Sequence, residues 1–371
     1  MVYLDNAATS HPKPAAVLAA VQRWFAEVGV SAERGDSRRC TVAAQEVAAA
    51  RAGVGAMLGW TGDRVAFVSG ATEGLNLALR AMLAPGDVVL TTAYEHSSVV
   101  RPLRALQLER GIRIEILAPT SDGSITAATF TERANALRPR LCVFTHASNV
   151  TGAVLDAAAF SQAARGVGAS TLLDASQSAG HCDLRVGADV VVASAHKGLL
   201  APPGLGFVAV RPGLTLRPQK QGGTGSSTAL DEHPTGWPNA FEAGTANTPA
   251  VFGLAAALRW AAEHGAGANH TLQERFGQLE QGLRRLPNVR LLVPPPGPRL
   301  PLLSFVHTHY DPAELGAVLD QHQVHVRSGH HCAPWLHAHI GTAASGTVRL
   351  SPGSTTTAAD IDHVLAVLAA M

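Results

Sequence analysis

The sequence contains few cysteines, few lysines, no excess of either charge and no long apolar run. Its four cysteines among 371 residues lie far apart, with no C-x-x-C pair: Cys40, Cys142, Cys182 and Cys332. This spacing fits a protein in a reducing compartment better than a disulfide framework or a zinc ribbon. Each cysteine therefore has to be judged by its own surroundings.

Basic and acidic residues are nearly equal in number, 29 against 28. This balance excludes the electrostatic footprint of a protein that binds nucleic acid or an anionic membrane surface. The first residues, M-V-Y-L-D-N, have neither the basic start nor the apolar core of a signal peptide, and no later apolar run is long enough to span a bilayer. We therefore expect a soluble, cytoplasmic protein.

Lysine is scarce, because the 29 basic residues include three lysines, Lys13, Lys197 and Lys220. We expect Lys13, between two prolines, to be exposed, and Lys220 lies in the polar turn R-P-Q-K-Q-G-G. Lys197 follows an apolar strand in V-V-V-A-S-A-H-K-G, and Asp174 closes another in L-L-D-A-S-Q. An amine that forms a Schiff base and a carboxylate that keeps a pyridine nitrogen protonated would together bind pyridoxal 5'-phosphate. For Lys197 taken alone, a solvated lysine after a core strand is an equally good interpretation.

Short apolar runs separated by helix-like stretches follow one another through most of the chain. The runs occupy residues 65–68, 88–90, 112–117, 141–144, 171–173, 190–193 and 206–210. Helical periodicity marks residues 14–28, 42–58, 75–83, 99–108, 157–167 and 250–264. Buried strands that alternate with helices predict an α/β protein with a largely parallel sheet covered by helices on both faces.

The length predicts two domains, at about 150 residues each. We expect an N-terminal segment, 1–13, that packs with the small domain, followed by a large cofactor-binding domain over 14–250. Residues 251–371 would form a linking helix and a smaller α+β domain, with a loop at V-P-P-P-G-P-R before the strand at 302–306.

Further polar motifs follow the predicted strands, at the carboxyl ends where ligands gather in such sheets. The turn S-G-A-T-E-G-L-N opens a helix, so its backbone N–H groups and the Thr72 hydroxyl could hold a phosphate or serve as ordinary caps. His96, in T-T-A-Y-E-H-S-S, could stack on an aromatic ring or be a satisfied surface group. Asn149, in H-A-S-N-V-T-G, could reach a ring hydroxyl or substrate, or simply make a turn. More donors lie beside Lys197, namely Ser194 and His196.

The order of these motifs is more specific than any one of them. A phosphate turn, a stacking histidine, an asparagine turn, D-x-x-Q and S-x-H-K follow successive strands. With them the chain resembles the class V aminotransferase superfamily of pyridoxal-phosphate enzymes, in particular its cysteine desulfurase and selenocysteine lyase branch. The resemblance runs from Y-L-D-N-A-A-T through F-E-A-G-T-A-N-T-P to R-S-G-H-H-C-A-P and V-R-L-S-P. It implies a fold type I enzyme that works as a homodimer on L-cysteine, in sulfur transfer of the kind used for iron–sulfur cluster assembly.

The resemblance also implies roles for individual residues around the cofactor. Lys197 matches the Schiff-base lysine, Asp174 the partner of the pyridinium, and Gln177 the donor to the ring oxygen. His96 matches the stacking, catalytic histidine, and Asn149 also contacts the cofactor. Matches to the phosphate ligands are Thr72, Ser194 and His196, together with Thr245, which would come from the partner subunit. Ala71 is a further expected cofactor-binding residue.

Two arginines match positions that contact the amino-acid substrate. Arg349 is a candidate bidentate clamp for its carboxylate, since a guanidinium fits a carboxylate with two parallel hydrogen bonds. Arg327 resembles a second active-site arginine, and Asn149 matches a substrate-contacting position as well as a cofactor contact.

Cys332 decides the reaction class. A free cysteine is most often a small buried hydrophobe, and Cys142 in an apolar strand, Cys182 in the turn A-G-H-C-D and Cys40 at a helix start have weaker cases for reactivity. R-S-G-H-H-C-A-P is polar and becomes cationic when its histidines are protonated, which suits an accessible, reactive thiol. In the family the cysteine at this position is the sulfur acceptor, so we expect a persulfide on Cys332.

Two other interpretations compete with this one. Imidazole and thiolate suit zinc, and Cys332 lies near five histidines that could ligate a metal: His325, His330, His331, His337 and His339. Their spacing matches no closed zinc motif, so we expect no metal. A binding module that has lost activity is the other alternative, and intact Lys197, Asp174 and His96 argue against it.

The substrate and the acceptor are less well determined. The stretch from Arg327 to Cys332 is short, which resembles the subgroup with a compact cysteine loop and implies a dedicated sulfur-acceptor protein. Residues 222–239 are abbreviated relative to some members, which bears on the edge of the dimer. The cofactor residues do not distinguish L-cysteine from selenocysteine, nor desulfuration from transamination or β-elimination.

Overall fold

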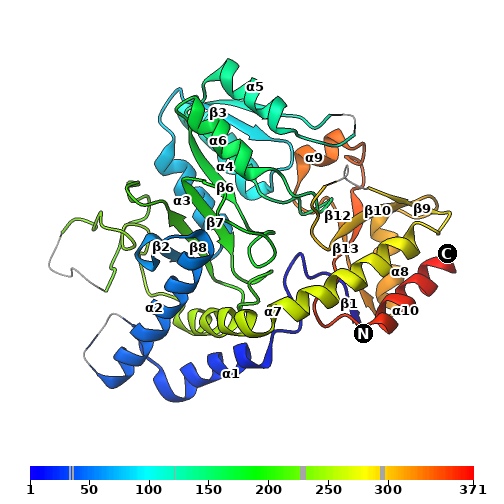
Figure 1. Cartoon of the computed structure of the whole chain (residues 1–371), viewed down its shortest axis with the longest axis horizontal. Coiled ribbons are helices and arrows are strands. Elements are labelled where there is room, and N and C mark those ends of the chain that lie inside the picture. Colours follow the sequence, from blue (N-terminus) through cyan, green and yellow to red (C-terminus); the bar gives the residue numbers. More distant parts are fainter. Residues whose placement is uncertain (33–34, 36, 121, 226–230, 293–296) are drawn as a thin grey trace.

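The structure is a computed structural model that describes residues 1–32, 35, 37–120, 122–225, 231–292 and 297–371. The two larger sheets, of seven and four strands, lie in separate lobes joined by one long helix, and both chain termini lie at the lobe with the four-stranded sheet (Figure 1). No helix in these ranges is long and apolar enough to cross a membrane.

The larger sheet has seven strands in the order β2-β8-β7-β6-β5-β3-β4. Neighbouring strands are parallel except at β8, which runs antiparallel to both β2 and β7. The strands are β2 (Val65–Val68), β3 (Val88–Thr92), β4 (Arg113–Leu117), β5 (Leu141–Thr145), β6 (Ser170–Asp174), β7 (Val190–Ser194) and β8 (Gly206–Val210). Every residue of β5, β7 and β8 is buried, as expected for strands covered on both faces.

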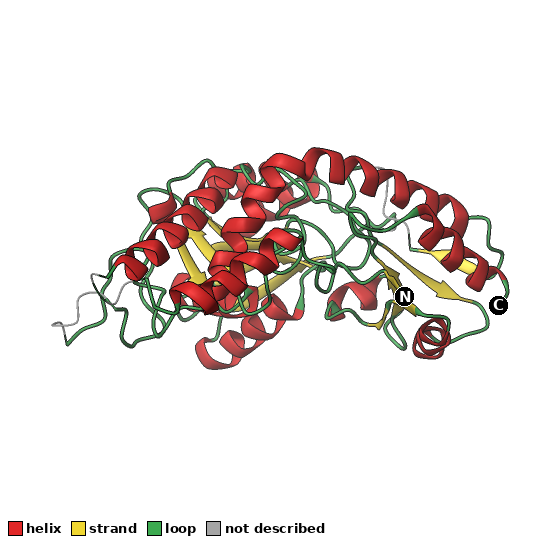
Figure 2. Ribbon diagram, turned by 90° about the horizontal axis from the view of Figure 1, so that it is seen from below, coloured by secondary structure: helices red, strands yellow, loops and turns green. Residues whose placement is uncertain are grey.

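Helices cover both faces of this sheet, and Figure 2 shows the strands between them. Two separate apolar clusters result, one containing Leu75 and Val99 and the other Phe130 and Phe160. The helices before and around the sheet are α1 (Ala15–Arg23), α2 (Arg38–Leu58), α3 (Ala71–Met82), α4 (Ser97–Arg110), α5 (Ala127–Leu137) and α6 (Ala157–Gly166). A π-helical turn, η1 (Trp24–Val28), extends α1, and a 3-10 turn, η2 (Gly62–Arg64), precedes β2.

The smaller sheet is antiparallel, in the order β12-β13-β10-β9. Its elements are β9 (Val289–Leu291), β10 (Leu303–His307), α8 (Pro312–Gln321), β12 (Arg327–Gly329), α9 (Pro334–His339), β13 (Thr347–Leu350) and α10 (Ala358–Ala369). The first residues lie on this lobe, because β1 (Val2–Tyr3) pairs with β11 (Val324–His325) and Leu4 belongs to the lobe's apolar core.

The helix α7 (Thr248–Leu283) connects the lobes and is 36 residues long, so the predicted helix at 250–264 was too short. Its second half continues through three glycines because Leu272, Phe276, Leu279 and Leu283 recur at helical spacing and are buried. The predicted border between residues 250 and 251 falls inside this helix and stays a prediction.

The predicted α/β fold is confirmed, and the seven strand predictions match the observed strands to within two residues. Sequence analysis missed α5, whose apolar period is weak because its buried residues are Phe130 and Ala134 alone. Parts of two predicted loops, residues 226–230 and 293–296, lie outside the described residues.

Candidate active site

A cavity of about 720 Å³ opens at the carboxyl ends of the parallel strands. The strand ends of β6 and β7 provide Asp174 and Lys197, and Arg327 reaches the cavity from β12 of the smaller sheet. Ten of the residues singled out from the sequence line it: Ala71, Thr72, His96, Asn149, Asp174, Gln177, Ser194, His196, Lys197 and Arg327. The other three, Thr245, Cys332 and Arg349, do not line this cavity.

Asp174 and Lys197 both line this cavity, and their side chains differ in the hydrogen bonds that they form. Asp174 is buried, and its Oδ1 accepts a 2.9 Å hydrogen bond from the Ser176 backbone N–H. Within the described part of the chain, no hydrogen bond is found for Lys197 Nζ. Burial lowers the pKa of Lys197 to about 8, and Asp174 opposes this effect. An amine with this pKa is partly neutral near physiological pH and can act as a nucleophile or a base.

The β2–α3 turn has the properties of an anion site. The N-cap of α3 is Gly70, which offers no side-chain acceptor to the first turn of the helix. The Ala71 N–H donates to Ser194 Oγ at 3.1 Å, and Thr72 Oγ1 lies 2.8 Å from Ser98 Oγ. His196 contributes a buried Nδ1 that lacks a partner. These donors and the helix N-terminus form one polar end of the cavity.

His96 caps α4 and is held in one tautomer. Its Nδ1 accepts a 3.0 Å hydrogen bond from the Ser98 N–H, so the proton of the neutral ring is on Nε2. Burial lowers the pKa of His96 to about 4, which keeps the ring uncharged at neutral pH. An uncharged, fixed imidazole over the cavity suits stacking on an aromatic ring.

Arg349 lies behind the cavity. Its side chain is fully buried and forms a 2.5 Å ion pair with Asp5, while Nη1 donates to the Asn149 carbonyl at 3.0 Å. Its Nε is buried without a partner. Of the two arginines predicted to contact substrate, Arg327 therefore lines the cavity, and Arg349 is engaged by a residue of the N-terminal segment.

Cys332 is the exposed member of the four cysteines, all of which the structure describes; Cys40 and Cys142 are buried. Its Sγ lies 3.6 Å from Arg327 Nη2. Its carbonyl accepts hydrogen bonds from the N–H and Oγ of Ser97, at 2.7 and 3.1 Å. The Cys332 loop is thus fixed to the first residue of α4, next to His96. Burial raises the pKa of Cys142 to about 12, which disfavours its thiolate.

The histidines near Cys332 do not form a metal centre in the described ranges, where no group of three or more potential ligands is found. His331 and His337 are buried and bond to Thr347 Oγ1 and Thr342 Oγ1, at 2.9 and 2.7 Å. One nitrogen of each ring is therefore engaged by a threonine hydroxyl, while His331 Nδ1 and His337 Nε2 are buried without a partner. The expectation that no metal binds here stays a prediction.

Thr245 is exposed and lines a different cavity, together with Gly244 and Asn247. Within one chain it is separate from the candidate phosphate ligands. Its predicted role depends on a partner subunit and stays a prediction.

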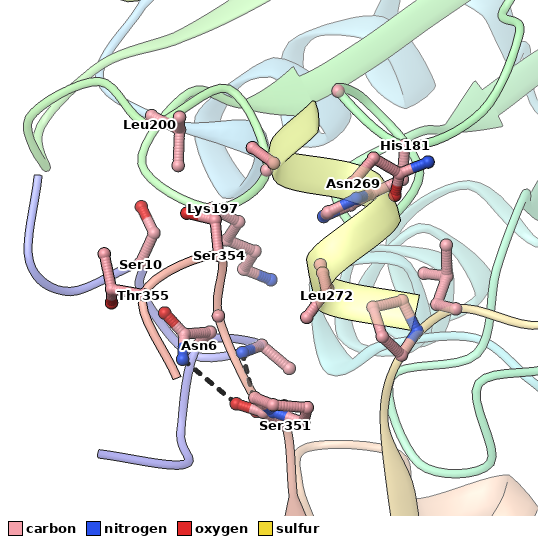
Figure 3. Close-up of a pocket in the computed structure, with 18 of the residues that line it drawn as sticks. Asn6, Ser10, His181, Lys197, Leu200, Asn269, Leu272, Ser351, Ser354 and Thr355 are labelled. Atoms are coloured by element: carbon pink, nitrogen blue, oxygen red, sulfur yellow. Dashed lines mark hydrogen bonds between the residues drawn. The ribbon is translucent and has the colours of Figure 1, made fainter. Parts of the chain in front are cut away.

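Sequence analysis missed the part that the N-terminal segment plays in the site. Besides Asp5, this segment provides the Ala7 carbonyl, which accepts a 3.0 Å hydrogen bond from Gln177 Nε2. A second cavity of about 910 Å³ lies on the other side of Lys197, between this segment and α7; Figure 3 shows Asn6, Ser10 and Lys197 around it. Two side chains line both cavities, Gln177 and Lys197.

The expectation that Lys13 is exposed was wrong. It is half-buried, and Nζ donates to Ser10 Oγ at 2.6 Å and to the His196 carbonyl at 2.7 Å. The segment folds back over the turn after β7, where backbone and hydroxyl oxygens replace water around the amine. The scarcity of lysine was the one signal in the sequence that could have drawn attention to it.

Glu95 is another buried group that the sequence analysis did not single out. Its Oε1 accepts hydrogen bonds from Thr92 Oγ1 at 2.5 Å and from the Thr145 N–H at 3.0 Å. Burial raises its pKa to about 8, and Asp174 adds to this effect, so the carboxyl is largely protonated at neutral pH. A neutral Glu95 leaves the Asp174 carboxylate as the negative charge at this end of the site.

The model of the aminotransferase class V family matches residues 2–364. This chain belongs to the class V aminotransferase family. A probable cysteine desulfurase of Mycobacterium leprae is 33% identical over 99% of this chain and 90% of its own. A cysteine desulfurase of Klebsiella pneumoniae is 30% identical, over 99% of this chain and 92% of its own.

Solved structures agree with this assignment. A cysteine desulfurase of Thermococcus onnurineus superposes with a TM-score of 0.91 and 28% identity, covering 100% of this chain and 94% of that one. A cysteine desulfurase of Escherichia coli gives a TM-score of 0.86 and 25% identity, covering 99% of this chain and 93% of the other. The resemblance read from the motifs and the expected fold are confirmed.

Proposed function

We propose that this protein is a pyridoxal-phosphate-dependent cysteine desulfurase, which converts L-cysteine to L-alanine and leaves the sulfur on Cys332 as a persulfide. The observation that carries the proposal is the position of Arg327. This one side chain lines the Lys197 cavity and also lies 3.6 Å from the exposed Cys332 thiol. The thiol and the candidate cofactor site are therefore neighbours, although 135 positions separate Cys332 from Lys197 in the chain.

The lining of the cavity fits pyridoxal phosphate. Its polar end offers the α3 N-terminus, Ser194 and the unpartnered Nδ1 of His196 for a phosphate. Asp174 lies among the lining residues as a buried carboxylate that can keep a pyridine nitrogen protonated, and Lys197 has no competing hydrogen bond in the described residues. When bound there, the cofactor would withdraw electrons from the substrate Cα.

The residues around the cavity can bind the amino acid and move its protons. Arg327 places a guanidinium at the cavity, where it can attract the substrate carboxylate. Arg349 can also bind the substrate carboxylate once its ion pair with Asp5 opens and frees a guanidinium N–H group. Lys197, with its pKa near 8, can accept the Cα proton on Nζ and return it.

The sulfur-transfer step forms one S–S bond and breaks one C–S bond. The Cys332 thiolate attacks the substrate Sγ, and the bond from Sγ to substrate Cβ breaks. The electron pair of that bond stays on Cβ, which takes up a proton and becomes the methyl group of alanine. The products are alanine and Cys332 carrying one additional sulfur atom, so no external oxidant is required.

We further propose that the protein acts in the cytoplasm as a homodimer and passes its persulfide sulfur to an acceptor protein, in the manner of iron–sulfur cluster assembly. The exposed position of Thr245, outside the Lys197 cavity of its own chain, supports a contribution to the partner's site. The fixed, short Cys332 loop supports dependence on an acceptor that docks at this surface.

The direct test is to incubate the reconstituted protein with L-cysteine and to measure alanine, sulfide and the mass of the Cys332 peptide. We expect stoichiometric alanine and a peptide heavier by one sulfur atom, and catalytic turnover once a reducing thiol is added. L-Selenocysteine is the comparison substrate. Formation of pyruvate instead of alanine would identify β-elimination and contradict the persulfide step.

A further inference from the structure

Lys13 is bound to the peptide unit that precedes Lys197. Its Nζ donates to the His196 carbonyl at 2.7 Å, and Ser10 Oγ lies 2.6 Å away as a second acceptor. None of the described residues forms an ion pair with Lys13. The Lys13 ammonium group therefore interacts with the backbone carbonyl of His196. This residue directly precedes Lys197, whose amine would carry the cofactor.

The His196 carbonyl collects an unusual number of donors. Besides Lys13, it lies within hydrogen-bond distance of the Ser10 N–H at 3.0 Å, Ser10 Oγ at 3.1 Å and Thr9 Oγ1 at 3.2 Å. A carbonyl oxygen has two lone pairs, so four donors compete for it, and the charged donor makes the shortest contact. The N-terminal segment thus holds this oxygen more tightly than a single backbone hydrogen bond would.

The turn at residues 195–201 does not use the His196 carbonyl in its own backbone hydrogen bonds. The carbonyls on either side are used inside the turn, because Ala195 accepts from the Ala201 N–H at 3.0 Å and Lys197 from the Leu200 N–H at 2.9 Å. The His196 carbonyl instead faces the N-terminal segment. The orientation of the 196–197 peptide fixes the direction in which the Lys197 side chain leaves the backbone.

The N-terminal segment has other attachments and does not depend on Lys13 to stay in place. Strand β1 pairs with β11, Asp5 is bound to Arg349, and Asn6 Nδ2 donates to the Ser351 carbonyl at 3.0 Å (Figure 3). Removal of the Lys13 amine should therefore loosen the 196–197 peptide without releasing the segment.

We propose that Lys13 is a positioning residue, which orients Lys197 through the His196 carbonyl and so holds the lysine in reach of the cofactor aldehyde. The proposal rests on the proposed pyridoxal-phosphate site. Lys13 does not line the Lys197 cavity, and its contact with the site is the backbone carbonyl of His196, through which it acts on Lys197.

The test compares the holoenzyme with the variants Lys13→Met and Lys13→Arg, and uses Lys220→Met as a matched control. Lys220 is a largely exposed lysine, paired with Glu73 at 2.7 Å. We measure the rate of cofactor loss on dialysis, the absorption band of the lysine-bound cofactor as a function of pH, and amide hydrogen exchange in residues 195–200 and 2–9. The cofactor probe throughout is pyridoxal 5'-phosphate.

We expect Lys13→Met to lose the cofactor about tenfold faster, as after loss of one charge-assisted hydrogen bond, to shift the pH dependence of the band, and to exchange faster in 195–200 alone. Lys13→Arg should restore most of the wild-type behaviour, because a guanidinium can donate to the same carbonyl. Lys220→Met should match the wild type.

Two results overturn the proposal. In the first, Lys13→Met retains the cofactor and its band like Lys220→Met. In the second, exchange also rises in residues 2–9 and arginine gives no rescue, which would make Lys13 a general structural residue. Borohydride reduction of the wild type distinguishes a failure of this proposal from a failure of the proposed function. If the reduction leaves no pyridoxyl group on Lys197, the proposed function itself is wrong.

Discussion

Asp5 and Arg349 form a buried ion pair, with Asp5 Oδ1 and Arg349 Nη2 2.5 Å apart. The first few residues of the chain are thereby bound to the strand β13, which carries the candidate substrate arginine. The same segment accepts a hydrogen bond from Gln177 and donates to the His196 carbonyl. It therefore touches three residues that the family resemblance assigns to substrate or cofactor binding, and it serves as part of the site.

Asp5→Ala should destabilise the protein by about 3 kcal/mol, because it leaves the buried Arg349 guanidinium unpaired. The double variant Asp5→Ala/Arg349→Leu should cost less than the sum of the two single changes, since it removes both charges. Urea unfolding of the four proteins of this cycle measures the coupling. Additive effects would show that the pair contributes no specific stability.

Cys332→Ala should abolish alanine and sulfide formation from L-cysteine while leaving cofactor binding unchanged, because the thiol lies outside the Lys197 cavity. Cys182→Ala is the matched control: this thiol is partly buried, burial raises its pKa, and its loss should leave turnover near the wild-type value. Activity and the cofactor absorption band are measured on both variants. Full activity of Cys332→Ala would eliminate the persulfide step.

The extent to which the sequence predicts this structure differs between local and long-range features. Strand β7 begins with the continuous apolar run 190–193, and the positions of Asp174 and Lys197 were predicted from where such runs end. The family resemblance added roles for Gln177 and Arg349. The Asp5–Arg349 pair spans 344 positions, and no local pattern encodes a contact at that separation.

The misjudged Lys13 has the same physical origin. Its neighbours in the sequence are prolines, and these predict an exposed turn. Its burial comes from residue 196, which the fold brings against it. The length of α7 was underestimated for a related reason, because its second half gains its stability from packing on the smaller sheet, and intrinsic helix propensity contributes less there.

Arg327→Met should raise the KM for L-cysteine by about 10- to 100-fold, because it removes a cation from the cavity that is proposed to receive the substrate carboxylate. It should also slow alkylation of Cys332, since it removes the guanidinium that lies 3.6 Å from Sγ. Arg327→Lys keeps the charge and should recover part of both effects. Steady-state kinetics and the iodoacetamide rate of the Cys332 peptide provide the two measurements. A changed KM with an unchanged alkylation rate would show that Arg327 does not affect the reactivity of the Cys332 thiol.

The rate at which the apoprotein takes up pyridoxal phosphate should depend on pH through Lys197. Burial lowers the pKa of this amine to about 8, from the ordinary value of about 10.4. Because the neutral amine attacks the aldehyde, the rate should rise about tenfold per pH unit below pH 8 and level off above it. The pKa of Lys197 is thus lower in the folded protein than in the unfolded chain. The protonated amine therefore destabilises the folded state below pH 8, and this destabilisation disappears as the pH rises from 8 to about 10.4. Stopped-flow measurement of the cofactor band gives the profile, and Lys13→Arg serves as the control, because Lys13 is the other lysine whose pKa burial lowers to about 8. A rate that keeps rising to pH 10 would show that Lys197 has an ordinary lysine pKa and that its surroundings do not prepare it for the cofactor.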